Sequence, residues 1–263
     1  MQTLRLEHRR ARIDAGELVS LRLAADGPEL VHQKGAPGWR SADTEMFPVI
    51  GPTAEADFRV RTPRGPAVQD QHGLLRERTY ELVDATASTA VYEKAYRADT
   101  AVPNSKYPAK SSAETLRWPY DFRFRKTYEM RPGGLEVGFE IRGDEGMPFM
   151  LGYHPAFRLT AEAAAVVVET GAEVIPLAEV MAVGDRARYV PDCTDVTLRN
   201  GDESAVRLQT QGFGHFMLWA PVPTMICVEP ITFYPYDVPQ ERLHEGFGVL
   251  AAEAFASVLI SAG

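Results

Sequence analysis

The chain has 263 residues, of which 45% are hydrophobic and 24% are charged, and its formal net charge is −8. Such a composition is ordinary for a globular protein and excludes disorder over most of the chain. The acidic balance argues against nucleic acids and membrane surfaces as partners, because both would need a concentrated basic face. No apolar run approaches the roughly 18 residues of a membrane span.

The N-terminus and the cysteines indicate a protein of the cytoplasm. Residues 1–12 carry charges throughout and contain no apolar core of a signal peptide. Cys193 and Cys227 form no CxxC pair, and the six histidines show neither HxH nor HxxxH spacing. We therefore expect a cytoplasmic protein without a local metal motif. We also expect a monomer or a homodimer.

Short stretches of alternating polar and apolar residues begin near the N-terminus. They predict strands at residues 18–23, 79–83 and 90–95. The 21 glycines and 19 prolines of the chain supply the turns that many short strands need.

The clearest local signal is a hairpin at residues 122–142. Apolar side chains occupy alternate positions on both sides of an Arg-Pro-Gly-Gly turn at residues 131–134. Period two on each side of such a turn predicts two antiparallel strands with one buried face. Lys126 falls on the apolar side, so the predicted buried face also carries one charged side chain.

The second half of the chain continues this pattern. Residues 206–210, 217–219, 224–228 and 254–260 favour strands, whereas the Ala-rich segment 161–168 is compatible with a helical turn or a strand. No segment has clean helical periodicity over three turns, and nothing indicates βαβ units. The sequence predicts an all-β chain with few or no helices, folded over residues 1–263 as one antiparallel β-sandwich or barrel domain.

Two titratable residues stand directly before prolines within apolar stretches. His154 lies in the segment 147–157, and Glu229 lies in the segment 224–230. A residue before proline favours extended backbone, and a proline marks the end or the edge of a strand. We therefore expect both side chains at the rim of a sheet, where apolar neighbours can shift their pKa values. Each residue alone also fits a structural role, His154 as a hydrogen-bonded histidine and Glu229 as the partner of an arginine.

His72 and Arg76 flank a predicted glycine turn in the segment 71–76. Loops on a rigid scaffold often carry function, and an imidazole with a guanidinium would suit a sugar or a phosphate ligand. Arg76 could equally hold a neighbouring carboxylate.

These segments, in this order, are similar to the aldose 1-epimerase (galactose mutarotase) family, especially its bacterial branch near the lactose-operon mutarotase-like proteins. The resemblance covers most of the chain and rests on FPVIG at 47–51, HGLLR at 72–76, WPYDF at 118–122, GYHPAF at 152–157, and Trp219 with CVEP at 227–230. It implies a large galactose mutarotase-like supersandwich and a cofactor-free catalytic pair at His154 and Glu229. It also implies substrate contacts at His72 and Arg76.

The sequence departs from the family pattern at two places. Pro52 follows the first motif where a basic residue is common, and Ile231 follows Glu229-Pro230 in place of tryptophan. Both departures concern the details of sugar binding rather than the acid and the base. The family's further acidic substrate contact has two candidates here, Asp192 and Asp195.

A carboxylate and an imidazole are suited to the interconversion of sugar anomers. Opening a cyclic hemiacetal needs a base for the C1 hydroxyl and an acid for the ring oxygen, and closure on the other face reverses both transfers. We expect Glu229 as the base and His154 as the acid, at opposite edges of one hollow the size of a pyranose ring. His72 and Arg76 would orient the sugar. This chemistry needs no metal and no other cofactor.

Three other functions remain compatible with the sequence. A non-catalytic carbohydrate-binding protein would use the same sandwich, and a hexose-phosphate epimerase would use Arg76 to neutralise a phosphate. A glycoside hydrolase ranks last, because it usually needs two carboxylates roughly 5–10 Å apart. Glu229 is the one carboxylate that stands directly before a proline in an apolar segment.

Overall fold

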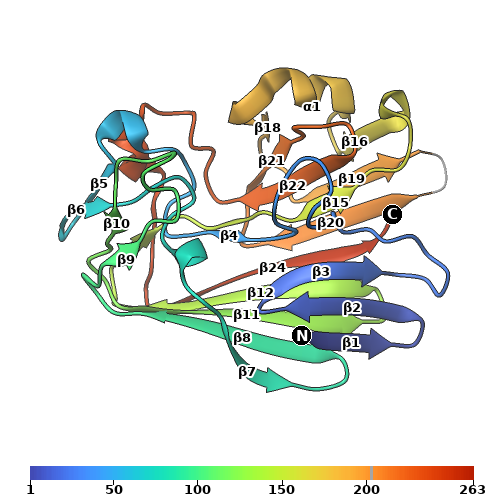
Figure 1. Cartoon of the computed structure of the whole chain (residues 1–263), viewed down its shortest axis with the longest axis horizontal. Coiled ribbons are helices and arrows are strands. Elements are labelled where there is room, and N and C mark those ends of the chain that lie inside the picture. Colours follow the sequence, from blue (N-terminus) through green and yellow to red (C-terminus); the bar gives the residue numbers. More distant parts are fainter. Residues whose placement is uncertain (202–203) are drawn as a thin grey trace.

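Two large antiparallel sheets pack against each other in the computed structural model, which describes residues 1–201 and 204–263 (Figure 1). In spatial order, the described strands of the larger sheet are β17 (Val174–Pro176), β16 (Val166–Thr170), β19 (Asp195–Asn200), β20 (Ala205–Gln211), β24 (Glu253–Ala262), β12 (Gly134–Gly143), β11 (Phe122–Arg131), β8 (Thr89–Tyr96) and β7 (Glu81–Ala85). Those of the smaller sheet are β18 (Arg188–Val190), β21 (His215–Trp219), β22 (Met225–Ile231), β14 (Gly152–Tyr153) and β4 (Glu45–Met46), and β15 (Ala156–Arg158) also pairs with β22. Aromatic rings from the two sheets meet between them, as Phe139 of β12 and Tyr153 of β14 do at 5.2 Å between ring centroids.

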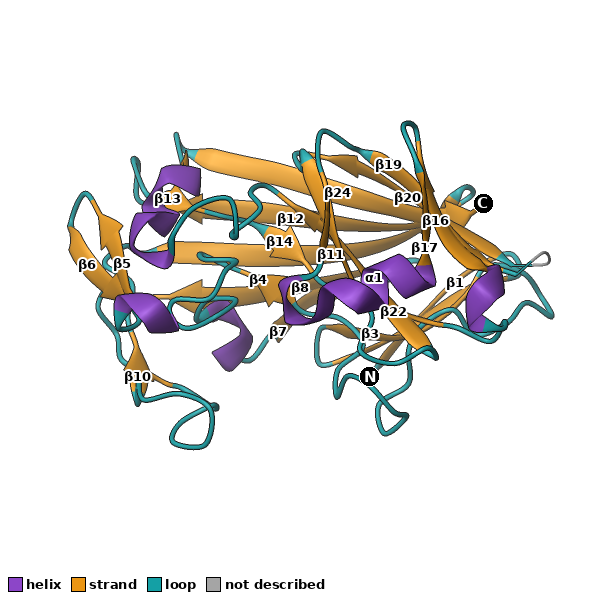
Figure 2. Ribbon diagram, turned by 90° about the horizontal axis from the view of Figure 1, so that it is seen from above, coloured by secondary structure: helices purple, strands orange, loops and turns teal. Residues whose placement is uncertain are grey.

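Shorter elements complete the fold. A third sheet contains β1 (Gln2–Leu6), β2 (Arg9–Asp14) and β3 (Glu17–Arg22), and the remaining strands pair as β5 (Arg59–Thr62) with β6 (Gly65–Val68), β9 (Val102–Pro103) with β10 (Thr115–Leu116), and β13 (Pro148–Phe149) with β23 (Gly248–Val249). The helical segments are α1 (Leu177–Val183) and the 3-10 turns η1 (Ala54–Ala56), η2 (Leu75–Glu77), η3 (Ala163–Ala165), η4 (Gly184–Arg186) and η5 (Gln240–Gly246), all short in Figure 2. Among the described residues, no helix is long and apolar enough to cross a membrane. The prediction of an antiparallel all-β sandwich with few helices is confirmed.

The predicted hairpin is present as β11 and β12. Phe122 pairs with Gly143 at its open end, and Arg131 pairs with Gly134 at the turn. Every second side chain of β11 is buried, as the alternation predicts. The hairpin lies in the interior of the larger sheet, between β8 and β24, so both of its strands have partners on each side.

Most other predicted strands are also present. Those expected at residues 18–23, 90–95, 206–210, 217–219, 224–228 and 254–260 correspond to β3, β8, β20, β21, β22 and β24. The strand expected at 79–83 begins two residues later, as the exposed edge strand β7. The ambiguous segment 161–168 contains both of its alternatives, because η3 leads directly into β16.

Helix α1 carries no signal that the sequence analysis could detect. It has seven residues, about two turns, whereas helical periodicity becomes distinct only over longer windows. Leu177 and Val180 form its buried stripe, and Gly184 follows it with a φ of 68°. Packing of this stripe against the sandwich therefore decides the helix more than local propensity does.

The lysine on the apolar face of β11 belongs to a buried cluster of charges. Lys126 Nζ lies 2.8 Å from Asp43 Oδ2 and 2.6 Å from Glu45 Oε1. The Tyr153 hydroxyl donates to the same Asp43 oxygen at 2.8 Å. Asp43 and Glu45 flank Thr44, so the cluster ties the segment that enters β4 to the larger sheet. This arrangement explains why a charged residue can stand on the buried face of β11.

Candidate active site

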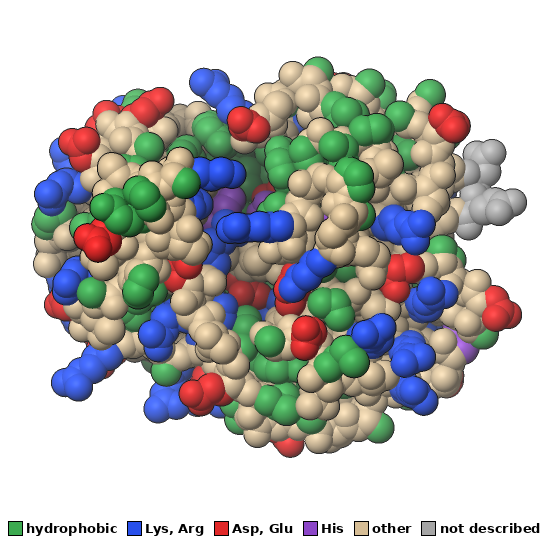
Figure 3. All heavy atoms as spheres, in the orientation of Figure 1, with side chains coloured by type: hydrophobic (Ala, Val, Ile, Leu, Met, Phe, Trp, Pro, Cys, Tyr) green, Lys and Arg blue, Asp and Glu red, His purple; other side chains and the backbone are tan. Residues whose placement is uncertain are grey.

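The four predicted site residues line one cavity of about 830 Å³: His72, Arg76, His154 and Glu229. The smaller sheet provides its floor, with His154 between β14 and β15 and Glu229 in β22. In Figure 3, a hollow in the middle of the molecule has histidine at its bottom and lysine and arginine side chains around its mouth. A separate hollow of about 570 Å³ beside Tyr96 contains none of the four.

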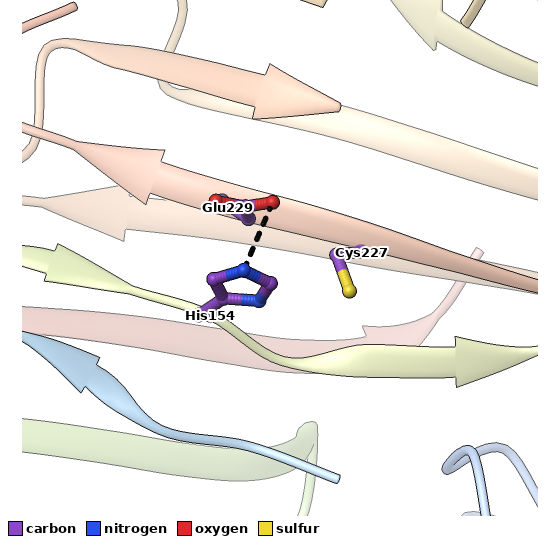
Figure 4. Close-up of side chains that lie close together, drawn as sticks. All are labelled: His154, Cys227 and Glu229. Carbon is purple, nitrogen blue, oxygen red and sulfur yellow. Dashed lines mark ion pairs between the residues drawn. The ribbon is translucent and has the colours of Figure 1, made fainter. Parts of the chain in front are cut away.

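His154 and Glu229 are cross-strand neighbours. Gly152 pairs with Ile231, and β15 continues the same register along β22, which places His154 opposite Glu229 with both side chains on one face. Glu229 Oε1 lies 3.4 Å from His154 Nε2 (Figure 4). The expectation that the two groups occupy opposite edges of the hollow is therefore wrong. They are adjacent, because the spacing of paired strands sets their separation.

The two prolines lie inside this sheet rather than at its rim. β22 runs between β21 and β14, so the prediction that Glu229 lies at a sheet rim is wrong. Pro155 and Pro230 have no N–H to donate, and β14 and β15 are separate strands because the ladder is broken between them. On the other side, the His154 N–H donates to Thr44 O at 2.8 Å, which holds the backbone extended at the break.

Burial sets the charge state of the pair. The His154 side chain is 6% exposed and that of Glu229 is 2% exposed. Burial raises the pKa of Glu229 to about 8, against the opposing effect of the Arg76 guanidinium. Burial, aided by the same guanidinium, lowers the pKa of His154 to about 3. Near neutral pH the pair therefore holds one proton, which burial favours on the Glu229 carboxyl.

Two tryptophans surround the His154 ring. The Trp39 ring stacks on it with 4.3 Å between centroids and 22° between planes, and the Trp219 ring meets it edge-on at 6.2 Å. His32 Nε2 donates to the Trp39 carbonyl oxygen at 2.7 Å and so helps to hold this residue beside the cavity. The aromatic surfaces restrict the imidazole to one orientation toward Glu229.

His72 occupies a strained turn at the cavity wall. Its φ of 74° lies in the left-handed region, and a Cβ on the following Gly73 would clash with the Phe47 carbonyl oxygen. His72 Nδ1 donates to Ile50 O at 2.7 Å, so its Nε2 carries the lone pair and acts as an acceptor. Burial, followed by the positive charge of Arg76, lowers the pKa of His72 well below its usual value. The turn therefore presents a neutral imidazole.

Arg76 makes no ion pair within the described part of the chain. Its Nη2 donates to Thr44 Oγ1 at 2.9 Å, and its Nε is buried without a hydrogen-bond partner among the described residues. The alternative in which Arg76 holds a neighbouring carboxylate is therefore not present as a direct ion pair among the described residues, although Glu77 and Glu45 lie near enough to raise the pKa of Arg76. A buried guanidinium nitrogen without a partner can donate to a ligand.

Asp192 and Asp195, the two candidates for an acidic substrate contact, do not line the cavity. The Asp192 side chain is 93% exposed beside His215, and Asp195 is paired with Arg207 of the neighbouring strand β20. The acidic residue that does line the cavity, besides Glu229, is Asp185 of η4. The sequence carries no signal for it, because its segment reaches the cavity only through the packing of α1.

The two departures from the family pattern have different surroundings. Pro52 lines the cavity and adds no charge to it, whereas Ile231 is buried in β22. Trp39, Arg40 and Lys106 also line the cavity and were missed by the sequence analysis. Each lies in a connection far in sequence from the motifs that contain His154 and Glu229, so only the fold brings it to the cavity.

A match to a protein-family model identifies the family of this chain. A family model described as aldose 1-epimerase matches residues 59–253. The chain belongs to the aldose 1-epimerase family. The family expected from the motifs is thus confirmed, whereas no curated protein matches the chain.

Solved structures of other proteins have the same fold as this chain. A galactose mutarotase-like protein from Lactobacillus casei is 20% identical, with a TM-score of 0.82 and complete coverage of both chains. A galactose mutarotase related enzyme from Lactobacillus acidophilus is 17% identical, with a TM-score of 0.78 over 100% of this chain and 97% of the other. A galactose mutarotase-like protein from Clostridium acetobutylicum is 14% identical, with a TM-score of 0.69 over 99% and 94%. The predicted galactose mutarotase-like sandwich is confirmed.

Cys227 joins His154 and Glu229 in a group whose spacing would suit a metal ion. Their donor atoms all lie within 4.8 Å of one another (Figure 4). Metal ligands must be deprotonated, however, and burial raises the pKa of the Cys227 thiol well above its usual value. Because the pKa of Glu229 is also raised and Arg76 is nearby, the local charge disfavours a cation. The expectation that this family member needs no metal stays a prediction.

Glu229→Gln is expected to raise the stability of the protein in alkaline solution. Because the folded state holds the Glu229 proton up to about pH 8 and the unfolded chain releases it near its ordinary pKa, native stability falls as pH rises through this window. Glutamine does not ionise, so the variant should not lose stability in this way. Its free energy of unfolding should exceed that of the native chain by on the order of a few kcal/mol above about pH 8, and by nothing near pH 4. Urea unfolding of both proteins between these limits measures it. An equal gain at every pH would contradict the raised pKa.

Proposed function

We propose that this member of the aldose 1-epimerase family is a mutarotase that interconverts the α and β anomers of an aldose. The observation that carries the proposal is the adjacent pair of His154 and Glu229, which holds one proton on the floor of a cavity of about 830 Å³. A cavity of this volume is suitable for a small ligand such as a sugar. Membership of the family supports the same chemistry.

In the proposed reaction, Glu229 takes the proton of the C1 hydroxyl and His154 gives its proton to the ring oxygen, so the C1–O5 bond breaks. After rotation about C1–C2, the same two transfers run backwards and close the ring on the other face. The sugar itself complements the charged form of the pair, because its hydroxyl donates to a carboxylate and its ring oxygen accepts from an imidazolium. We therefore infer that the proton shared by the pair moves from Glu229 to His154 as the sugar binds.

The other cavity residues orient the ring in this proposal. His72 Nε2 accepts from a sugar hydroxyl, since its Nδ1 is already engaged with Ile50 O. Arg76 donates through its unpartnered Nε, while Thr44 holds the far end of its guanidinium. Holding the sugar in one orientation makes both proton transfers effectively intramolecular.

Anomer exchange itself is the test of the proposed function. Magnetisation transfer between the anomeric proton signals of several aldoses, measured by NMR with and without the protein, should reveal at least one sugar whose exchange is accelerated. The rate in heat-inactivated protein gives the contribution of the buffer. Binding of a sugar without acceleration would favour a non-catalytic carbohydrate-binding protein and contradict the proposal.

The rate of anomer exchange should be highest at pH values where the pair of His154 and Glu229 holds one proton. With the raised pKa of Glu229 near 8 and the lowered pKa of His154 near 3, the one-proton form of the pair dominates between these values. We expect kcat/KM for the free protein to be level through neutral pH and to fall about tenfold per pH unit above about pH 8. Rates measured from about pH 4 to 10 in overlapping buffers test this. An unchanged rate across the whole range would contradict paired acid–base catalysis.

A further inference from the structure

Basic side chains from four separate segments converge on the candidate active site. The described cations that line the cavity are Arg40 in the connection after β3, Arg76 in η2, Lys106 and Lys110 between β9 and β10, and Arg186 in η4. The carboxyl groups that line it are Asp185 and Glu229, and the second of these is protonated near neutral pH. The cavity is therefore positive although the whole chain carries a net charge of −8.

Most of these cations have no carboxylate partner among the described residues. Lys106 is paired with Asp70 at 2.9 Å, but Arg40, Arg76, Lys110 and Arg186 form no ion pair in the described part of the chain. Outside the cavity some arginines are paired, as Arg199 is with Glu169, and others such as Arg61 form no ion pair among the described residues, so the cavity is distinguished by four unpaired cations that line one hollow.

Two of the guanidinium groups are close enough to oppose each other's charge. Burial lowers the pKa of Arg76, the carboxylates of Glu77 and Glu45 oppose this effect, and the nearby positive charge of Arg40 adds to it. Like charges brought together cost free energy that the neighbouring carboxylates offset only in part, and an anion placed between them would lower that cost further. In the proposed reaction the Nη2 and Nε of Arg76 are engaged with Thr44 and the sugar ring, so Arg76 favours such an anion through its positive charge.

The positions of the cations fit a substituent that is remote from the reacting carbon. His154 and Glu229 are buried on the floor, whereas Arg40, Lys110 and Arg186 are exposed around the mouth. A sugar with C1 on the floor would direct a substituent elsewhere on its ring toward these side chains. An anionic substituent would meet them there, and the positive field would also attract the substrate from solution.

We propose that the substrate of this protein is an aldose with an anionic substituent, a phosphate ester or a carboxylate, which Arg40, Arg76, Lys110 and Arg186 recognise. The inference rests on the proposed mutarotase function and names the substrate class of the same site. A phosphate and a carboxylate both offer oxygens for charge-assisted hydrogen bonds, so the experiment separates these two sources.

The decisive measurement compares three matched sugars. Glucose, glucose 6-phosphate and glucuronic acid share one ring and differ in the group at C6, and NMR exchange gives kcat/KM for each after the spontaneous rate is subtracted. We expect at least one anionic sugar to exceed glucose by about tenfold or more at low ionic strength, and the preference to shrink as salt is added. The anionic sugar with the higher kcat/KM shows whether the site prefers a phosphate or a carboxylate. Equal or higher kcat/KM for glucose, together with the same order in the galactose series, would overturn the proposal.

Variants at the mouth test whether the named side chains carry the preference. Arg40→Gln, Lys110→Gln and Arg186→Gln, singly and combined, should lower the ratio of anionic to neutral kcat/KM, by about tenfold or more for the combined variant and mainly through KM. Arg61→Gln is the matched control, because Arg61 is exposed on β5 and does not line the cavity. An unchanged ratio in the combined variant would overturn the assignment of these residues.

Binding separates this inference from the proposed function. Isothermal titration with the same three sugars reports recognition without requiring turnover. Tighter binding of an anionic sugar, lost in the combined variant, supports the inference even if no sugar is interconverted faster. Accelerated exchange of glucose with no advantage for either anion would leave the mutarotase proposal standing and overturn the inference.

Discussion

Glu229→Gln and His154→Ala are each expected to lower kcat for anomer exchange by about 10²–10⁴-fold, the range typical of a lost general acid or base. Each substitution removes one of the two groups that we propose to exchange protons with the sugar, and these groups lie 3.4 Å apart on the cavity floor. Because both groups act in the same step, the double variant should lose little more than either single variant. Exchange between anomeric proton signals, measured at equal protein concentration, gives the three rates.

His8→Ala and Glu81→Gln are matched controls for this experiment. They remove the same chemical groups from exposed positions outside the cavity, so exchange should proceed at the native rate. Circular dichroism and thermal unfolding establish that the catalytic variants remain folded. A native exchange rate in either folded catalytic variant would contradict the assignment of the pair.

Lys126→Met is expected to lower the free energy of unfolding by about 3–5 kcal/mol, the range measured when one partner of a buried ion pair is removed. The substitution leaves the Asp43 and Glu45 carboxylates buried and without their shared cation. Lys94 offers limited compensation, because its Nζ lies 3.8 Å from Glu45 Oε2. Urea unfolding at neutral pH, followed by tryptophan fluorescence, gives the change.

Arg123→Met on the same strand shows what loss of an exposed ion pair does. Arg123 Nη1 lies 2.9 Å from Glu93 Oε1, but its side chain is 68% exposed. We expect the free energy of unfolding to change by less than about 1 kcal/mol in this variant. Equal unfolding midpoints for the native chain and Lys126→Met would instead show that the buried charges do not hold the cluster together.

The buried cluster and the candidate active site meet at Thr44. Asp43 and Glu45 face Lys126 between the sheets, whereas Thr44 accepts from Arg76 on the cavity side and pairs with His154 through the backbone. This alternation follows from the extended backbone, in which successive side chains point to opposite faces. The same short segment therefore anchors the sandwich and positions two of the cavity residues.

The strands could be predicted where one face is buried against a single core. Period-two alternation identified β11 and β12 closely, because buried side chains alternate there with partly or fully exposed ones along most of ten residues. Helix α1 and the two-residue strands β4 and β14 left no comparable pattern. Their pairing depends on partners distant in sequence, and a window of a few residues contains too little periodicity to reveal them.

The sequence by itself determined the antiparallel sandwich, the family, and four residues that the fold brings to one cavity, because alternation and short motifs are local properties of the chain. Only the tertiary structure decided that His154 and Glu229 are cross-strand neighbours, since this depends on the register between strands 75 positions apart. It also decided the raised pKa of Glu229 and the gathering of cations from four connections. Burial and the convergence of distant loops arise when the whole chain packs, so no local pattern of residues records them.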